Sequence, residues 1–140
     1  MNTSDSLWLL PILVCLVCGC GPSGPATYPV SGTVTYQGEP LPLGIVMFMP
    51  EQGPSSQPAA IDQQGRYQLE ATAGEHRVAV IAVPPREGGR PDPTMEGGFD
   101  YTGVPPAKSL IPPKYNRAHT SGITVAVEPG RRNEIDILLE

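Results

Sequence analysis

Three cysteines are the first candidates for chemistry in this sequence, because they stand close together. Cys15, Cys18 and Cys20 form a Cys-x-x-Cys-x-Cys pattern of the kind that holds a metal ion or a redox pair. Metal ligands need a folded, hydrogen-bonded environment around them. These cysteines instead lie between an apolar run and a short segment rich in Gly and Pro. We therefore expect no metal or redox site here, and we assign the chain no cofactor.

The two histidines are the next candidates, as a metal site or a catalytic base. His76 and His119 are far apart, and neither has a second histidine at helix or strand spacing. Tyr101 and Tyr115 would add only two ligands to His119, so a metal site is not the favoured interpretation. Ser121 lies near His119, but neighbours in sequence seldom align a nucleophile with its base, and no Gly-x-Ser-x-Gly motif is present. The sequence therefore predicts no catalytic residue.

Cationic and aromatic side chains gather near the end of a long segment without strand or helix patterning. They are Lys108, Lys114, Tyr115, Arg117 and His119. Tyrosine and arginine are favoured at protein interfaces, and an aromatic ring also stacks on sugars. The last four of these residues are therefore candidate contacts for an envelope protein or a glycan. The favoured and simpler interpretation is that Ile111 and Tyr115 hold the segment on the protein body while the charges stay in solvent.

Charge and composition exclude one class of partner. The formal net charge is -5, and the nine lysines and arginines are scattered along the chain. No basic stripe neutralises a phosphate backbone, so nucleic acid is not an expected partner. The 16 glycines and 18 prolines are interleaved with β-branched runs, which indicates many short strands and turns rather than disorder.

The element that precedes Cys20 is an apolar run over residues 7–17. It is long enough for the core of a signal peptide and shorter than the ~20 residues that span a bilayer as a helix. With Val17 and Gly19 before Cys20, the segment resembles the lipobox of bacterial lipoproteins. The alternatives are a plain secretory signal or a buried apolar helix.

The resemblance implies a cellular location as well as a covalent modification. In lipoproteins the thiol equivalent to Cys20 carries diacylglycerol, the signal (here residues 1–19) is removed, and the new amino terminus receives a fatty acid such as palmitate. We therefore expect an exported protein anchored in the membrane through Cys20, with residues 20–27 as a flexible tether. Gly21 stands where many inner-membrane lipoproteins carry Asp, which favours the outer membrane.

Alternating apolar residues predict the body of the protein, residues 28–140, as seven short strands. Their expected ranges are 28–36, 45–49, 59–61, 66–70, 76–83, 123–127 and 135–139. The strand over 76–83 is apolar on both faces, so we expect it in the centre of a sheet with both faces covered. The last two strands are predicted to form a hairpin. Asp62 to Gly65 is a type I turn, because glutamines stand where a calcium loop needs carboxylates.

These strands predict an all-β fold, a seven-stranded antiparallel Greek-key sandwich. The inner faces should hold Val34, Val46, Phe48, Tyr67, Leu69, Val78, Val80, Val125, Val127, Ile135 and Ile137. Residues 84–119 break the pattern with repeated Pro and Gly, which excludes a long helix and predicts a long functional or mobile connection.

Several motifs resemble carboxypeptidase regulatory-like domains, which are transthyretin-like (prealbumin-like) β-sandwiches. They are Val-Ser-Gly-Thr-Val at 30–34, Gly-Glu-Pro-Leu at 38–41, the Asp-x-x-Gly-Arg-Tyr-x-Leu segment at 62–69 and Ala-Gly-Glu-His at 73–76. The segments at 111–115 and 130–137 are similar to small bacterial lipoproteins of this fold that have no assigned activity. Regulatory domains of this kind are not catalytic. The resemblance thus implies a non-catalytic, lipid-anchored envelope module for binding or structural support.

The competing hypothesis is a small extracytoplasmic enzyme or metal-binding protein. It would build its site on residues 84–119, the long connection between two of the predicted strands.

Overall fold

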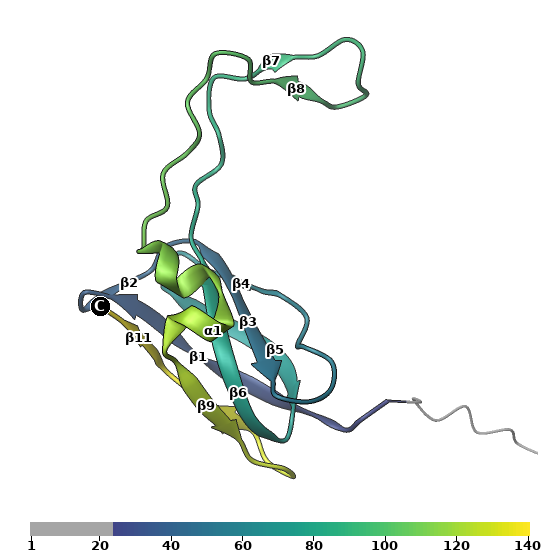
Figure 1. Ribbon diagram of the computed structural model, residues 1–140, viewed down its shortest axis with the longest axis vertical. Helices are drawn as coiled ribbons and strands as arrows, with labels where there is room; N and C mark the ends of the chain where they lie inside the picture. The colour runs from purple at the N-terminus through teal and green to yellow at the C-terminus, as the bar shows by residue number, and fades with distance from the viewer. Residues whose placement is uncertain (1–23) are drawn as a thin grey trace, which may run out of the picture.

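Residues 24–140 are described by a computed structural model, which shows two β-sheets packed face to face and a long arm that projects from one end (Figure 1). The all-β prediction is confirmed at this level. The expected signal over 1–19, Cys20 and residues 21–23 of the expected tether lie outside the described residues. No helix among residues 24–140 has the length and apolar character needed to cross a bilayer.

The first sheet is built around β1 (Thr27–Tyr36), the longest strand. On one side β1 pairs antiparallel with β5, and at its end with the short β2; on the other side it pairs parallel with β10 and β11. These partners span β2 (Glu39–Pro40), β5 (Arg66–Thr72), β10 (Asn133–Glu134) and β11 (Ile137–Leu139).

The second sheet is wholly antiparallel in the order β4-β3-β6-β9. Its strands are β3 (Gly44–Pro50), β4 (Ala59–Ile61), β6 (Gly74–Ile81) and β9 (Thr124–Val127). β6 lies between β3 and β9, as predicted for the most apolar strand. The predicted turn at Asp62 is also present, since the Gly65 amide donates to the Asp62 carbonyl at 2.9 Å.

The prediction of a terminal hairpin is wrong. β9 pairs with β6, whereas β10 and β11 cross to the other sheet and run parallel to β1, so the sandwich is not antiparallel throughout. The Asn133 side chain binds the backbone at Glu128 and Arg131 and so holds the crossing turn. Alternation of apolar residues shows which side of a strand faces the core, but it does not show which strand lies next to it. The hairpin was predicted because the two strands follow each other in the sequence.

The crossing strand lies very close to β1 at one glycine. The Ile135 amide donates to the Ser31 carbonyl at 2.8 Å, and the Thr33 amide donates to an Asp136 carboxylate oxygen at 2.9 Å. Between these bonds, a Cβ on Gly32 would overlap the Ile135 carbonyl. Only glycine fits this approach of two backbones.

The core lies between the two sheets, as predicted. Of the eleven residues expected there, nine are buried; Val125 and Ile135 are partly buried and pack against them. The Phe48 ring is central, with its centroid 6.1 Å from that of Tyr67 and 5.9 Å from that of His76. His76 is therefore a core residue.

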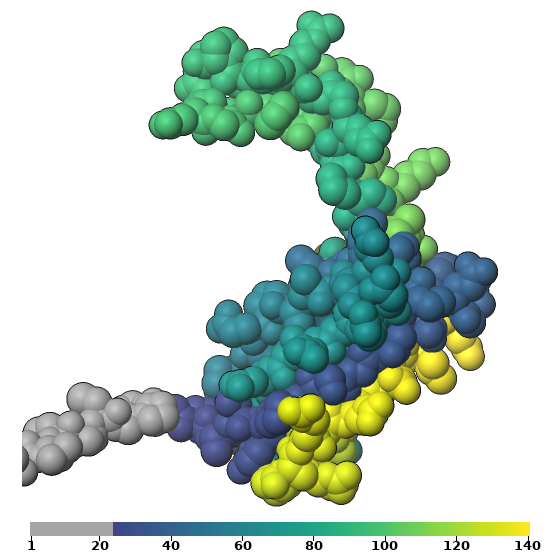
Figure 2. Space-filling view, turned by 180° about the vertical axis from the view of Figure 1, so that it is seen from behind, coloured from purple at the N-terminus to yellow at the C-terminus, as the bar shows by residue number. Residues whose placement is uncertain are grey.

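Residues 84–119 contain more structure than predicted. Residues 84–109 form the arm, which ends in a small hairpin of β7 (Arg90–Pro91) and β8 (Phe99–Asp100) and stands clear of the sandwich (Figure 2). The chain then returns through η1 (Pro113–Asn116) and α1 (Ala118–Ser121), which pack on β6.

The outer face of β6 is only partly covered, so this part of the prediction is wrong. Ala79 is buried at 4% exposure, but Ile81 is 38% and Val83 is 44% exposed. The short η1 and α1 pack on β6 but leave these two side chains in solvent.

Candidate partner-binding site

The candidate contacts lie on the segment that returns from the arm to the sandwich. Pro112 precedes η1 and Pro113 begins it, where the fixed φ of proline suits the first helical position. The Thr120 hydroxyl donates to the Lys114 carbonyl at 2.7 Å and so ties η1 to α1. Gly122, at φ 72°, ends α1 in the left-handed conformation and directs the chain into β9. The segment is therefore short but well defined.

Tyr115 is not available for a partner, which corrects its prediction as a contact. Its ring is buried at 4% exposure. Its hydroxyl donates to the Glu140 carbonyl and accepts from the Glu140 amide, both at 2.9 Å. Ile111 is buried beside it in the same core cluster. The favoured interpretation, in which these two residues hold the segment on the body, is confirmed.

The basic side chains of this segment remain in solvent. Lys108, Lys114, Arg117 and His119 are all exposed. The Lys114 Nζ lies 4.7 Å from the centre of the Tyr115 ring, so the core aromatic holds this cation at the surface through a cation–π contact. No acidic side chain among residues 24–140 forms an ion pair with these four.

A hollow beside α1 joins the cationic segment to the second sheet. It has a volume of about 450 Å³ and is lined by Met49, Pro50, Glu51, Gln52, Arg77, Ala118 and His119. Arg77 Nη2 lies 3.3 Å from a Glu51 carboxylate oxygen at its rim. The hollow is open and shallow, and a thioether and an imidazole face it together. Such a surface suits a macromolecular contact better than the enclosure that a small ligand requires.

The structure gives His76 no catalytic geometry. It is buried at 1% exposure, with Nδ1 3.0 Å from the Gly74 carbonyl and Nε2 3.2 Å from the Thr72 hydroxyl. Both ring nitrogens are thus occupied within the core. A general base must reach the proton that it removes, and this imidazole faces the interior.

The three proposed metal ligands are not brought together. Tyr101 lies in the arm, where its ring is covered by the Arg86 guanidinium 5.0 Å from its centre. Tyr115 is inside the sandwich and His119 is on its surface. Among residues 24–140, no three His, Cys, Asp or Glu side chains converge in a way that would hold a metal ion.

Asp62 is likewise used by its own turn. Backbone hydrogen bonding from Arg66 is the main cause that lowers its pKa, and the Gln64 amide and Arg66 side chain add to it. Asp62 also lines a wide hollow of about 610 Å³ together with residues of β1, β4 and β5, but its carboxylate there already accepts the hydrogen bonds of its own turn.

Sequence reasoning did not single out the exposed apolar side chains at the tip of the arm. Met95 is 59% and Phe99 is 52% exposed there. In the same hairpin the Thr94 hydroxyl and amide both donate to Asp92, and Thr102 binds Asp100 in the same way. These bonds lower the pKa of both aspartates and keep them charged. The repeated Asp-x-Thr around Gly97-Gly98 was the sequence signal for this hairpin.

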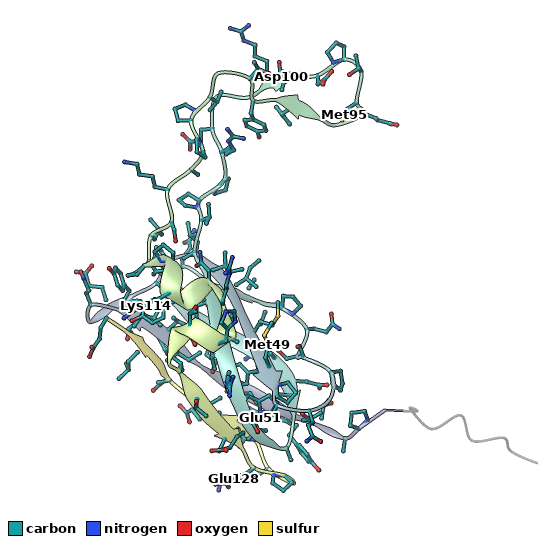
Figure 3. All side chains as sticks on the ribbon, viewed as in Figure 1. Met49, Glu51, Met95, Asp100, Lys114 and Glu128 are labelled. Atoms are coloured by element: carbon teal, nitrogen blue, oxygen red, sulfur yellow. The ribbon has the colours of Figure 1, made fainter. Side chains whose placement is uncertain are left out.

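The arm is stiffened along its length. Its two legs each contain a Pro-Pro pair, at 84–85 and 105–106. The Leu110 amide donates to the Ala82 carbonyl at 2.8 Å at the base, and Arg86 donates to the Val104 carbonyl at 2.6 Å further along. Because proline fixes φ, these legs hold the tip at a distance from the sandwich (Figure 3).

Comparison with known proteins gives limited information. No protein-family model matches the chain, and no curated protein matches it. Among solved structures, a DUF3823 family protein from Parabacteroides merdae is similar, with a TM-score of 0.42 and 15% identity over 82% of this chain. A DUF3823 family protein from Bacteroides ovatus gives a TM-score of 0.41 and 18% identity over 81% of this chain. The chain spans less than half of each solved chain, 46% and 44% respectively.

Proposed function

We propose that this protein is a lipid-anchored, non-catalytic module of the cell envelope that serves in binding or structural support. The observation that carries the proposal is the Gly19-Cys20 pair at the end of the apolar run over 7–17. That run is too short to span a bilayer and has the length of a signal-peptide core. Cys20 would be the first residue of the mature protein and the site of its lipid, with the outer membrane as the favoured location.

The proposal includes a transthyretin-like sandwich of the carboxypeptidase regulatory type. Two face-to-face sheets, a core centred on Phe48 and the turn at Asp62 agree with it. A Greek-key order of the strands remains part of the proposal.

The arm and the exposed cations beside its base would supply the partner contacts. The chain enters β1 at Thr27, which pairs with Thr72 near the start of β6, whereas the arm leaves after the end of β6. The arm therefore projects from the end of the sandwich opposite the proposed tether (Figure 1). This arrangement would place the contacts on the side that faces away from the anchoring membrane, toward an envelope protein or glycan.

Intact-mass analysis of the protein from a membrane fraction, beside a Cys20→Ser variant, tests the anchor. We expect a mass that starts at Cys20 and includes diacylglycerol and a fatty acid, and we expect the variant to lose both the lipid and the cleavage. A chain that keeps Cys15 and Cys18 without lipid would overturn the proposal.

A further inference from the structure

Seven of the exposed large apolar side chains of the described chain gather on two different parts of the molecule. One is the arm tip, residues 90–100, with Met95 and Phe99. The other is the outer face, which we define as the solvent side of β3 and β6 where the arm begins. Its exposed members are Ile45, Met49, Ile81, Val83 and the adjoining Leu110.

The exposed apolar side chains of the outer face are connected along β3, whereas on β6 the buried Ala79 interrupts them. Ile45 and Ile81 are register partners on neighbouring strands, so their side chains lie next to each other on the same side of the sheet. Two residues further along, Met47 and Ala79 are the next pair on that side, followed by Met49 and Arg77. Met49 then borders the hollow that it shares with His119. Exposed apolar side chains that gather on one face in this way mark an interaction site.

The arm tip forms a matching protrusion. The Met95 side chain lies against Gly98, directly before Phe99, since a Cβ on Gly98 would be 2.6 Å from the Met95 Cβ. A two-stranded hairpin with exposed apolar side chains is marginal on its own in water. The tip therefore gains stability from any surface that covers it.

The charges of the two features are complementary. The arm tip carries one cation, Arg90, against three carboxylates, Asp92, Glu96 and Asp100. At Met49 the outer face adjoins a hollow lined by Arg77, which pairs with Glu51, and by His119 of α1, and the exposed Lys114 and Arg117 lie on the same short segment as His119. Figure 3 shows Lys114 and Met49 on opposite sides of the short η1 and α1, and Met95 with Asp100 far from both. An acidic apolar tip and a cation-bordered apolar face fit each other and keep like surfaces apart.

The arm does not deliver the tip to the outer face of its own chain. The Pro-Pro pairs and the bonds from Leu110 to Ala82 and from Arg86 to Val104 hold it outward. Every copy, however, presents both a tip and a face. Two copies related by a twofold axis would each place a tip on the other's face, which closes the assembly.

We propose that the arm tip of one chain docks on the outer face of a second copy, so that two chains exchange arms in a symmetric dimer. Reciprocity matters because one aromatic buries only ~150–250 Å², whereas specific interfaces bury ~1,200–2,000 Å² in total. The inference rests on the arm as the binding element of the proposed function and does not depend on lipid at Cys20. A membrane as the occupant is disfavoured, since an acidic tip repels anionic headgroups.

Site-specific photo-cross-linking in the full-length protein tests the exchange. A photoreactive phenylalanine analogue replaces Phe99, and light and heavy-isotope copies are mixed in mild detergent before irradiation. We expect a dimer-sized product whose mixed-isotope peptides join residue 99 to residues 44–50 or 76–83 of the other copy. The same analogue at Leu138, which is 72% exposed on the first sheet, is the control and should give no such product.

Cross-links from residue 99 only to its own chain, to lipid or to another protein would overturn the proposal, as would their absence at all concentrations. Solvent-exposed substitutions provide an independent readout by sedimentation. Phe99→Ser and Ile45→Ser should each weaken dimerisation at least tenfold without changing the monomer's circular dichroism, whereas Leu138→Ser should leave it unchanged. A dimer that resists both of the first two substitutions would also contradict arm exchange. This outcome is separate from the mass of the Cys20 anchor, so the two proposals fail independently.

Discussion

At the scale of single residues, the two phenylalanines of this chain show how the position of a side chain decides its contribution to the free energy of unfolding. Phe48 is fully buried between the sheets and contacts Tyr67 and His76 through its ring, whereas Phe99 is 52% exposed in the arm. Burying an aromatic side chain supplies both transfer free energy and close packing, and truncating it leaves a cavity.

We expect Phe48→Ala to lower the free energy of unfolding by about 3 to 5 kcal/mol. Phe99→Ala should change it by less than about 0.5 kcal/mol in the monomer, because exposed positions contribute little. Urea unfolding of both variants at a concentration where the protein is monomeric measures the difference. Equal losses would show that Phe48 is not at the centre of the core.

Tyr67 connects the core to the crossing strand. Its hydroxyl donates to the Ile135 carbonyl at 2.7 Å. Burial, with a smaller contribution from the charge of Asp136, raises the pKa of Tyr67 well above its ordinary value of 10.0. At neutral pH, Tyr67→Phe should cost about 1 to 3 kcal/mol because it leaves the carbonyl unpaired. Tyr36→Phe, whose hydroxyl bond is exposed, is the matched control.

The raised pKa of Tyr67 also predicts the alkaline behaviour of the protein. Below the unfolded-state pKa near 10, both states keep the proton and the stabilising contribution of Tyr67 is complete. Above it, the unfolded chain loses the proton first, so stability falls by about 1.4 kcal/mol per pH unit from this group alone. In Tyr67→Phe this part of the decline should vanish. Identical slopes above pH 10 for the two proteins would contradict the assignment.

At the scale of elements, the arm and the sandwich are separate in their packing. No residue between Val83 and Leu110 is buried, whereas Ile111 and Tyr115, immediately after the arm, belong to the core. The arm therefore adds surface without contributing to the interior, and η1 with α1 closes the sandwich behind it.

Replacing residues 86–106 with a short Gly-Ser linker should leave the sandwich folded. We expect the midpoint of thermal unfolding to change by only a few degrees, because a flexible loop of different length alters closure entropy by less than about 1 kcal/mol. Differential scanning calorimetry provides the measurement. Ile111→Ala is the contrasting variant and should lower the midpoint clearly; a large loss on deletion of the arm itself would show that the arm supports the fold.

At the scale of the whole molecule, the first and the last strand of the described fold pair with each other in the first sheet. β1 opens the described fold and β11 ends it, and their parallel pairing joins Val34 to Ile137. Parallel neighbours cannot be joined by a tight turn, so all intervening residues lie between these two strands. The last strand therefore completes both the first sheet and the core.

Truncation after Glu134 should prevent cooperative folding. It removes the buried Ile137 and Leu139, exposes the edge of β1 and leaves Tyr67 without its acceptor. Losing two such aliphatic side chains alone costs about 4 kcal/mol or more, a large part of the stability of a domain of this size. Circular dichroism with thermal melting is the measurement, and Leu138→Ala, which removes only an exposed side chain of β11 and should keep the transition, is the control. A sharp melt in the longer truncation would refute the closing role of β11.

The sequence alone determined the features that depend on local pattern. Period-two alternation placed Val46, Phe48, Tyr67 and Val80 in the core, and Asp with Gly at fixed spacing located the turn at 62–65. Repeated proline and glycine correctly excluded a long helix from residues 84–119, and the burial of Ile111 and Tyr115 followed from their apolar character beside solvated charges.

Only the tertiary structure decided which segments meet. Alternation cannot say whether a strand pairs with its sequence neighbour, so the crossing of β10 and β11 to β1 required the approach of Ile135 to Gly32. The tertiary structure also buries Tyr115, because the backbone of Glu140 provides both hydrogen-bond partners of the Tyr115 hydroxyl inside the fold. The same packing leaves Ile81 exposed while covering Ala79, since burial depends on how far η1 and α1 extend over the sheet and not on hydrophobicity.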